Sequence, residues 1–536
     1  MKRQGKFRRA FALLMALLLM VSAVTTSAFA AITQNQTGSI TVGGIETTQG
    51  LTITASAYKL MDVNVNANGQ PQTPVYSWVG SVADWVRTNY SNYIGTESDN
   101  SVQEAFSNAN AADIATFYDD LAAAIRGGTI KDFSPAQTAT ASGGSANFSK
   151  LAMGNYLILV ENGMRVYSPA AANLVPVWED GAWTLPQGTI QVNEKSSEPS
   201  IQKTVKAPGT ETGKDADNSN IGDDLTFDIT ADVPRFPAKA VSRTYAISDK
   251  LPEGMTLNDG SIKVYGVKGD NETLLPSADA YQQEKTRPGS LGTSDFTLTF
   301  AYDKISSYDK IHVTYTAYLN GSAQLGTDGN VNTAYLDYSN NPYVTGSLHT
   351  MTDTAKVYTY GMKISKVDSD DADKFLAGAQ FELYASEEDA SAGNNPIAFV
   401  SSGDGEYRRA TEADQPTTTT LTVGSEGDKA GLLTLTGLDE GNWYLKETKA
   451  PDGYNLPKSP FTVTITDGTP LDGKVANSIE GNDAIVGVTI QNSDGFQLPT
   501  TGGMGTILFT AVGVALMGAA VVLIVLAIRR KKADSR

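Results

Sequence analysis

The chain has 536 residues, with 41 basic and 59 acidic side chains, and its formal net charge at pH 7 is −18. This acidic balance argues against nucleic acid as a partner, because phosphate binding requires Lys and Arg. The chain has no cysteine and only two histidines, which excludes disulfides and leaves neither a His cluster for a metal nor a ready Ser-His-Asp triad. We therefore expect no cofactor and no metal ion, although the sequence leaves a metal site in the first domain open.

The first thirty residues have the pattern of a secretory signal peptide. Basic residues crowd positions 2–9, an apolar run covers 10–24, and Ala28-Phe29-Ala30 has the small-x-small form of a cleavage site. Such a segment is removed on export and takes no part in the fold. The remainder is long enough for about three domains.

Residues 31–195 mix strand and helix signals. Apolar and polar residues alternate at 38–42 and 51–55, and a third strand is predicted at 156–160. Apolar residues between them recur at helical spacing and stop at two glycines: Ile114, Phe117, Leu121, Ile125, Gly127 and Gly128. This pattern predicts a β-sandwich with a helical insertion.

The rest of the exported chain consists almost entirely of strand and turn patterns. Alternating runs such as 225–229, 296–300 and 312–317 are separated by Gly, Asp and Asn clusters, which favours sandwiches. The predicted fold class is mainly β, with three tandem immunoglobulin-like sandwiches. The predicted segments are a signal peptide (1–30), the N-terminal sandwich (31–195), a second domain (196–358), a third domain (359–496) and a C-terminal sorting signal with a transmembrane helix and basic tail (497–536).

The third domain contains ionisable residues in strands that point toward the core. Lys366 shares a strand face with Ile364, and Glu447 shares one with Leu445. Burying one charge alone is costly, but an apolar site lowers the pKa of Lys and raises that of Glu. A neutral Lys366 amine can then attack the side-chain amide of Asn492, with Glu447 moving protons to the departing ammonia.

This domain resembles the Cna-B-type isopeptide domain of Gram-positive pilins. The family's glutamate motif YxLxETxAPxGY matches residues 443–454, with Trp443 in place of the first Tyr. The resemblance implies an intramolecular bond between Lys366 and Asn492, assisted by Glu447. The alternative is an ordinary Lys–Glu ion pair in a non-reactive sandwich.

The second domain looks like the Cna-A-type isopeptide domain. It opens with Ser200-Ile-Gln-Lys203 and continues with Tyr245-Ala-Ile-Ser-Asp249 and Asn332-Thr-Ala-Tyr. The resemblance implies a Lys203–Asn332 bond with Asp249 as the acid. Alternatives within the domain are the amides of Asn330, Asn340 and Asn341 and the carboxylate of Asp228, which is expected to point inward.

The C-terminal forty residues have three consecutive features. A short extended motif comes first, an apolar run from 506 to 528 is as long as the ~20 residues that span a bilayer, and a basic cluster at 529–532 follows as a stop-transfer signal. The motif is Leu498, Pro499, Thr500, Thr501 and Gly502. This tail resembles the LPxTG cell-wall sorting signal of Gram-positive surface proteins, in which sortase cuts between Thr and Gly. The resemblance implies cleavage after Thr501 and transfer of its carboxyl group to an amine.

A polymer requires such an amine on the next subunit. Lys195 lies between the first two domains and follows Trp183-Thr-Leu-Pro and Ile190-Gln-Val, in the position of the pilin-motif lysine of backbone pilins. Asn193-Glu194 replaces the Tyr-Pro that precedes this lysine in the family. Lys206 is the nearest alternative.

These resemblances cover nearly the whole exported chain and imply a sortase-assembled major pilin of the fimbrial type, a structural protein and not an enzyme. Its implied partners are copies of itself, pilus and housekeeping sortases, ancillary pilins, peptidoglycan and a host receptor or matrix. Its expected location is the cell wall and surface. The alternative is a ligand-binding adhesin, either an ancillary tip pilin or a wall-anchored monomer, and Lys195 separates the two. A wall-anchored hydrolase has no supporting residue constellation.

Overall fold

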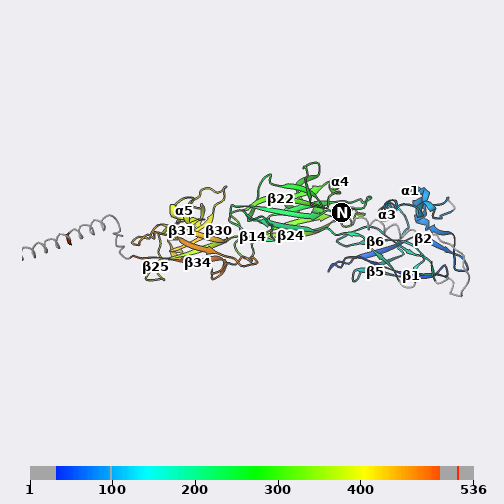
Figure 1. The fold of residues 1–536 in the computed structure, drawn as a ribbon, viewed down its shortest axis with the longest axis horizontal. Helices are drawn as coiled ribbons and strands as arrows, with labels where there is room; N and C mark the ends of the chain where they lie inside the picture. Colours follow the sequence, from blue (N-terminus) through cyan, green and yellow to red (C-terminus); the bar gives the residue numbers. More distant parts are fainter. Residues whose placement is uncertain (1–31, 97–98, 180–181, 187–188, 495–515, 518–536) are drawn as a thin grey trace, which may run out of the picture. The chain divides into compact units, whose positions relative to one another are not determined.

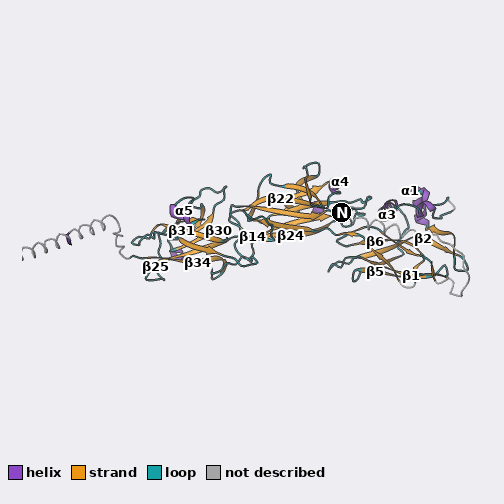
Figure 2. Cartoon of the chain, in the orientation of Figure 1, coloured by secondary structure: helices purple, strands orange, loops and turns teal. Residues whose placement is uncertain are grey.

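The computed structural model describes residues 32–96, 99–179, 182–186, 189–494 and 516–517. They fall into two compact units. Unit 1 contains the chain up to Thr359 together with Thr469–Gly473, and unit 2 contains the rest. Strands dominate both units, as Figure 1 and Figure 2 show, so the predicted mainly β class is confirmed. The boundaries between the three predicted domains stay predictions.

The first part of unit 1 contains two main sheets, ordered β3-β2-β6-β8 (with β4 beside β2) and β11-β1-β5. Two strand pairs, β10-β9 and β12-β7, complete it. The strands are β1 (Thr37–Gly43), β2 (Thr54–Val65), β3 (Pro71–Trp78), β4 (Gln137–Thr140), β5 (Ser145–Ala152), β6 (Gly154–Glu161), β7 (Val166–Tyr167), β8 (Ala170–Leu174), β9 (Val177–Glu179), β10 (Ala182–Thr184), β11 (Thr189–Asn193) and β12 (Ser196–Ser197). The strand predicted at 51–55 begins three residues later than expected, at Thr54.

Strand β6 is apolar on both faces because it is covered on both. Tyr156 and Ile158 pack with the β1 and β5 side chains, whereas Leu157 and Leu159 pack with the helices. The helices are α1 (Gly80–Asn89), η1 (Ser91–Tyr93), α2 (Glu104–Ser107) and α3 (Ala111–Arg126). The predicted insertion is therefore a third layer on the sandwich.

Helix α3 follows its sequence signals. The Asn110 side chain caps it by accepting hydrogen bonds from the Ala112 and Asp113 amides, both at 2.9 Å. Phe117 and Leu121 are fully buried, and Gly127 follows the last helical residue. The predicted helix is confirmed.

The second part of unit 1 is a sandwich of two sheets. One has the order β13-β15-β22-β18-β19, with β17 beside β22, and the other has the order β14-β24-β23-β16-β21-β20. The strands are β13 (Ile201–Lys206), β14 (Ala216–Asn218), β15 (Asp224–Asp232), β16 (Tyr245–Lys250), β17 (Met255–Leu257), β18 (Lys263–Lys268), β19 (Asn271–Leu274), β20 (Tyr281–Thr286), β21 (Thr293–Phe300), β22 (Lys310–Leu319), β23 (Asn330–Tyr338) and β24 (His349–Tyr358). Two short helices, η2 (Pro288–Ser290) and α4 (Tyr302–Ile305), lie in its loops.

Unit 2 is also a sandwich of two sheets. Its sheets have the orders β27-β28-β30-β25-β34-β33 and β29-β26-β31-β32. The strands are β25 (Tyr360–Asp368), β26 (Gln380–Tyr384), β27 (Phe399–Gly403), β28 (Glu406–Arg409), β29 (Leu421–Thr422), β30 (Leu432–Leu438), β31 (Gly441–Lys449), β32 (Phe461–Ile465), β33 (Ser478–Ile479) and β34 (Asn482–Asn492), with α5 (Glu387–Ala392) and η3 (Gly427–Lys429) between them. Strands β25 and β34 pair in parallel over their length.

The predicted membrane span lies, apart from residues 516–517, outside the described residues. Within the part of the chain that is described, no helix is long and apolar enough to cross a bilayer. The signal peptide and the sorting motif 498–502 also lie outside it.

Candidate functional site

Two buried amines stand out among the lysines of the described residues. Lys203 on β13 and Lys366 on β25 both have 0% exposure, and the buried charged residues include no other lysine. Strand alternation explains their burial, because Lys203 shares a face with Val205 and Lys366 shares one with Ile364. A long cationic side chain in a core requires partners, so their surroundings define the candidate sites.

The first site lies in the second part of unit 1, between the two sheets of its sandwich. Lys203 Nζ is in close contact with Asp249 Oδ2 on β16 and donates a hydrogen bond to the Tyr315 hydroxyl on β22 at 2.8 Å. The same hydroxyl donates to Asp249 Oδ1 at 2.8 Å and accepts from Asn332 Nδ2 on β23 at 2.7 Å. The structure thus brings Lys203, Asp249 and Asn332 together around one phenol.

The walls of this site are aromatic. The Phe227 ring stacks on Tyr315 with centroids 5.3 Å apart, and the Phe296 ring meets it edge-on at 5.1 Å. Burial lowers the pKa of the Lys203 amine despite the nearby Asp249 carboxylate, and it raises the pKa of Asp249 despite Lys203. Both shifts favour a neutral amine beside a neutral acid.

The other candidates in this domain are engaged elsewhere. The expected inward direction of Asp228 is wrong: Phe227 and Ile229 on either side of it point into the core, so Asp228 faces away. There it contacts Lys206 and His312 at 2.8 and 2.9 Å. The Asn330 amide donates to the backbone oxygens of Gln324 and Val357. The amide of Asn340 donates to Gly163 O at 2.8 Å, and the Asn341 side-chain oxygen accepts from the Tyr343 amide. Of these asparagines, Asn332 is the one that hydrogen-bonds to the Tyr315 hydroxyl, which in turn contacts Lys203.

The second site lies between the two sheets of unit 2. Asn492 Nδ2 on β34 donates to Glu447 Oε1 on β31 at 2.7 Å and to Asn455 O at 3.1 Å. Lys366 Nζ donates to Ile490 O at 3.4 Å, because parallel pairing sets Lys366 opposite Ile490, two residues from Asn492. All three predicted residues are therefore buried in one region.

Burial has the same electrostatic effect here. It lowers the pKa of Lys366 to about 8, against the opposing effect of Glu447, and it raises the pKa of Glu447. At neutral pH roughly a tenth of Lys366 is then the neutral, nucleophilic amine, since each pH unit below the pKa costs a factor of ten.

We expect bond formation in unit 2 to accelerate as pH rises toward 8. Its rate follows the neutral fraction of Lys366, which increases about tenfold per pH unit below the pKa. To measure this rate, unreacted chain unfolded in urea is diluted into buffers from pH 5.5 to 9. The peptide cross-linked through Lys366 is then quantified over time. A rate independent of pH would contradict a titrating amine nucleophile.

Three oxygens at the two sites are buried and have no hydrogen-bond partner among the described residues: Asn332 Oδ1, Glu447 Oε2 and Asn492 Oδ1. An unsatisfied buried oxygen costs about 1–3 kcal/mol, and in a native protein it calls for a functional or structural explanation. Two of the three are the carbonyl oxygens of the amides expected to react.

The contacts of two tyrosines near these sites were not predicted from the sequence. Tyr315 has the same inward alternation as Val313 and Ala317, which was the available signal. Tyr454, at the end of the glutamate motif, donates to Asp368 Oδ2 at 2.7 Å. The neighbouring Asn455 amide donates to Ser493 O at 3.0 Å, so this loop is held across the end of β34 beside Asn492.

Lys195 lies between β11 and β12 with an exposed side chain. Its carbonyl accepts from the Ser168 amide at 2.9 Å, and the preceding Glu194 amide donates to Gly43 O at 2.9 Å. Lys206 is more enclosed, with 30% side-chain exposure and an ion pair to Asp228. An exposed side chain on a backbone held by these two hydrogen bonds fits an acyl acceptor, and the more enclosed Lys206 fits that role less well.

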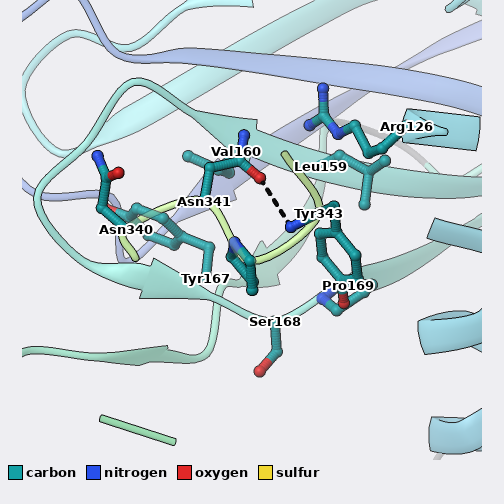
Figure 3. Close-up of a pocket in the computed structure, with 10 residues that line it drawn as sticks. Arg126, Leu159, Val160, Tyr167, Ser168, Pro169, Asn340, Asn341 and Tyr343 are labelled. Atoms are coloured by element: carbon teal, nitrogen blue, oxygen red, sulfur yellow. Dashed lines mark hydrogen bonds between the residues drawn. The ribbon is translucent and has the colours of Figure 1, made fainter. Parts of the chain in front are cut away.

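Figure 3 shows a small pocket between the first and second parts of unit 1. Its lining includes Arg126, Tyr167 and Tyr343, and its volume of about 10 Å³ holds about one water molecule. Nearby, Tyr343 OH donates to Asp119 Oδ1 at 3.3 Å, and Tyr338 OH donates to Met164 O at 2.5 Å. The pocket belongs to a packed interface and is too small for an organic ligand. In the described residues no group of three His, Asp or Glu side chains is placed to hold a metal.

Comparison with known proteins agrees with these observations. Residues 361–478 match the SpaA family model, a prealbumin-like fold domain, and residues 490–535 match the LPXTG cell wall anchor motif. The chain is 28% identical to the trypsin-resistant surface T6 protein of Streptococcus pyogenes serotype M6 over 387 residues, covering 63% of this chain and 70% of that protein. It is 26% identical to the fimbrial subunit type 1 of Actinomyces viscosus over 452 residues, covering 74% and 78%.

The fold also resembles a solved structure. The T6 backbone pilin of Streptococcus pyogenes serotype M6, described as having a modular three-domain structure, superimposes with a TM-score of 0.56 at 19% identity, covering 86% of this chain and 99% of that one. A wall-anchor motif behind a multidomain β chain defines a surface protein anchored to the cell wall. With a surface-protein relative and a fimbrial-subunit relative beside this anchor, the chain is a structural pilus subunit. The class and location predicted from the sorting tail are confirmed.

Proposed function

We propose that this pilin is cross-linked internally by two isopeptide bonds, Lys203–Asn332 and Lys366–Asn492. In each, the neutral lysine amine attacks the side-chain carbonyl carbon of Asn, the new C–N bond forms, and the amide nitrogen leaves as ammonia. The amine loses one proton and the leaving nitrogen gains one, so the neighbouring acid, Asp249 or Glu447, only transfers protons. Each site reacts once, and the chain is a structural protein rather than a turnover enzyme.

One observation carries this proposal. Among the described residues, each buried lysine lies in a core that also holds a buried carboxyl group and a buried Asn amide contributed by other strands. An ordinary buried ion pair needs no amide, and leaving amide oxygens without partners is unfavourable. A reaction explains why all three groups are present twice.

The proposal extends to assembly. Sortase cleaves between Thr501 and Gly502 of one copy and transfers the Thr501 carbonyl to Lys195 of the next, releasing the C-terminal segment. The exposed position of Lys195 on a backbone clamped to Gly43 and Ser168 supports this role. The partners are other copies, pilus and housekeeping sortases, ancillary pilins, peptidoglycan and a host receptor or matrix.

The two internal bonds would also carry mechanical load. Lys366 and Asn492 lie on the first and last strands of unit 2, β25 and β34. A covalent link between them transmits tension along the chain without unfolding the strands between. Such a link takes the part that disulfides have in many exported proteins.

The test is intact mass spectrometry of the expected exported form, residues 31–501. Each bond releases one ammonia of about 17 Da, so we expect a mass about 34 Da below that calculated from the sequence. Peptide mapping should then identify the Lys203–Asn332 and Lys366–Asn492 pairs. A mass equal to the calculated value would refute both bonds, and a deficit of one ammonia would refute one.

A further inference from the structure

The two candidate sites differ in how the acid reaches the amide. In unit 2, Glu447 Oε1 accepts directly from Asn492 Nδ2 at 2.7 Å. In unit 1 the acid is Asp249, whose side chain is one methylene shorter, and its two oxygens meet Lys203 Nζ and the Tyr315 hydroxyl. In unit 1 the Tyr315 hydroxyl accepts the hydrogen bond of the Asn332 amide nitrogen. In unit 2 the Glu447 carboxyl group has the equivalent position beside the Asn492 amide nitrogen.

The Tyr315 hydroxyl contacts every reacting group of its site. It accepts from Lys203 Nζ at 2.8 Å and from Asn332 Nδ2 at 2.7 Å, and it donates to Asp249 Oδ1 at 2.8 Å. Its ring is 1% exposed and is stacked on Phe227, its register partner on β15. The hydroxyl is therefore held between the attacking amine and the leaving nitrogen.

We propose that Tyr315 is a catalytic residue of the Lys203–Asn332 reaction, passing the proton from the attacking amine to the leaving amide nitrogen. This inference rests on the isopeptide function proposed above. As Lys203 Nζ bonds to the Asn332 side-chain carbon, that carbon becomes tetrahedral and Asn332 Nδ2 gains a lone pair that can accept a proton. The phenolic proton turns from Asp249 Oδ1 to Asn332 Nδ2, while the surplus proton of Lys203 Nζ moves to the Tyr315 oxygen. The C–N bond of the amide then breaks and ammonia leaves. At the end of the reaction the Tyr315 hydroxyl is protonated again, as it was at the start.

A phenol suits this task. It can accept one hydrogen bond while donating another, so a proton can enter and leave through one oxygen. Burial and the neighbouring Asp249 raise the pKa of Tyr315 well above its ordinary value, which keeps the hydroxyl protonated before the reaction. Asp249 is then free to take the ammonium proton of Lys203 and leave the amine neutral.

The test compares both sites in one molecule. The full exported form, residues 31–501, carrying Tyr315→Phe is diluted from urea, and the two cross-linked peptides are quantified over time. Positioned acid–base groups contribute about 10²–10⁴-fold, so we expect the Lys203–Asn332 rate to fall at least tenfold while the Lys366–Asn492 rate is unchanged. Tyr318→Phe is the matched control, because Tyr318 lies on the same strand but faces away from the core, and it should alter neither rate.

Equal rates for Tyr315→Phe and wild type would overturn the role of Tyr315. To separate proton transfer from packing, a fluorinated tyrosine introduced at position 315 alone preserves the ring shape but makes the hydroxyl more acidic. We expect it to change the first rate several-fold, as Brønsted behaviour requires, whereas an unchanged rate would reduce Tyr315 to a packing residue. Failure of the parent proposal is distinguishable, because wild type itself would then form no Lys203–Asn332 peptide.

Discussion

Replacing Asp249 with Asn is expected to abolish the cross-link of the second sandwich while leaving that of unit 2 intact. The carboxamide has nearly the shape of the carboxyl group but cannot take the proton of the Lys203 amine. The variant should therefore retain one ammonia, about 17 Da, relative to the cross-linked wild type. Breaking a buried pair from one side costs about 3–5 kcal/mol, and an unclosed loop on the order of 100 residues forfeits about 4.7 kcal/mol of chain-entropy stabilisation.

These two contributions are not additive. A loss of about 3 kcal/mol alone lowers the melting temperature by roughly 10 °C for a domain of this size. Mass spectrometry and calorimetry of residues 31–501 measure the two effects. Asp259→Asn is the control, since Asp259 is an exposed turn residue of the same sandwich, and it should change neither quantity beyond the substitution's own mass. Full cross-linking in Asp249→Asn would show that Asp249 is not the required acid.

Replacing Lys195 with Ala is expected to eliminate the covalent polymer. The Thr501 carbonyl needs an amine acceptor on the next copy, and a methyl group offers none. Wall extracts of cells expressing this variant should show a monomer on immunoblots in place of an SDS-resistant ladder. The internal bonds involve other residues, so the released monomer should keep its mass deficit of about 34 Da.

Lys206→Ala provides the comparison. Lys206 is ion-paired with Asp228 and partly enclosed, so we expect its removal to leave the ladder unchanged. A ladder that persists in Lys195→Ala and disappears in Lys206→Ala would transfer the role to Lys206. A ladder that survives both changes would mean that another lysine is the acceptor, or that the shaft is built by a different linkage.

Much of the local structure could be predicted from the sequence because it depends on local patterns. Helix α3 follows from its apolar spacing and from the glycine at its end. The inward directions of Lys203 and Lys366 follow from strand alternation. The start of β2 was less predictable, because the alternation begins at Leu51 but pairing with β6 and β4 begins at Thr54.

The part played by Tyr315 could not be predicted in this way. Lys203 and Tyr315 are 112 residues apart in sequence, and their contact depends on the register of β13, β15 and β22. The same applies to Asp228 and Asp249, the two carboxylates considered for this site. Only the pairing of strands in the folded sandwich determines which of them enters the core beside Lys203.

By itself, the sequence determined the kinds of group available: strands with inward lysines, carboxyl and amide side chains, an exposed-linker lysine and a wall-anchor tail. These properties depend on residue type and on a periodicity of two along each strand. The tertiary structure alone decided which amine lies near which amide, and that a phenol stands between one acid and its amide. The physical reason is that such neighbours come from different strands, and strand pairing and sheet packing, not sequence spacing, set the distances between their side chains.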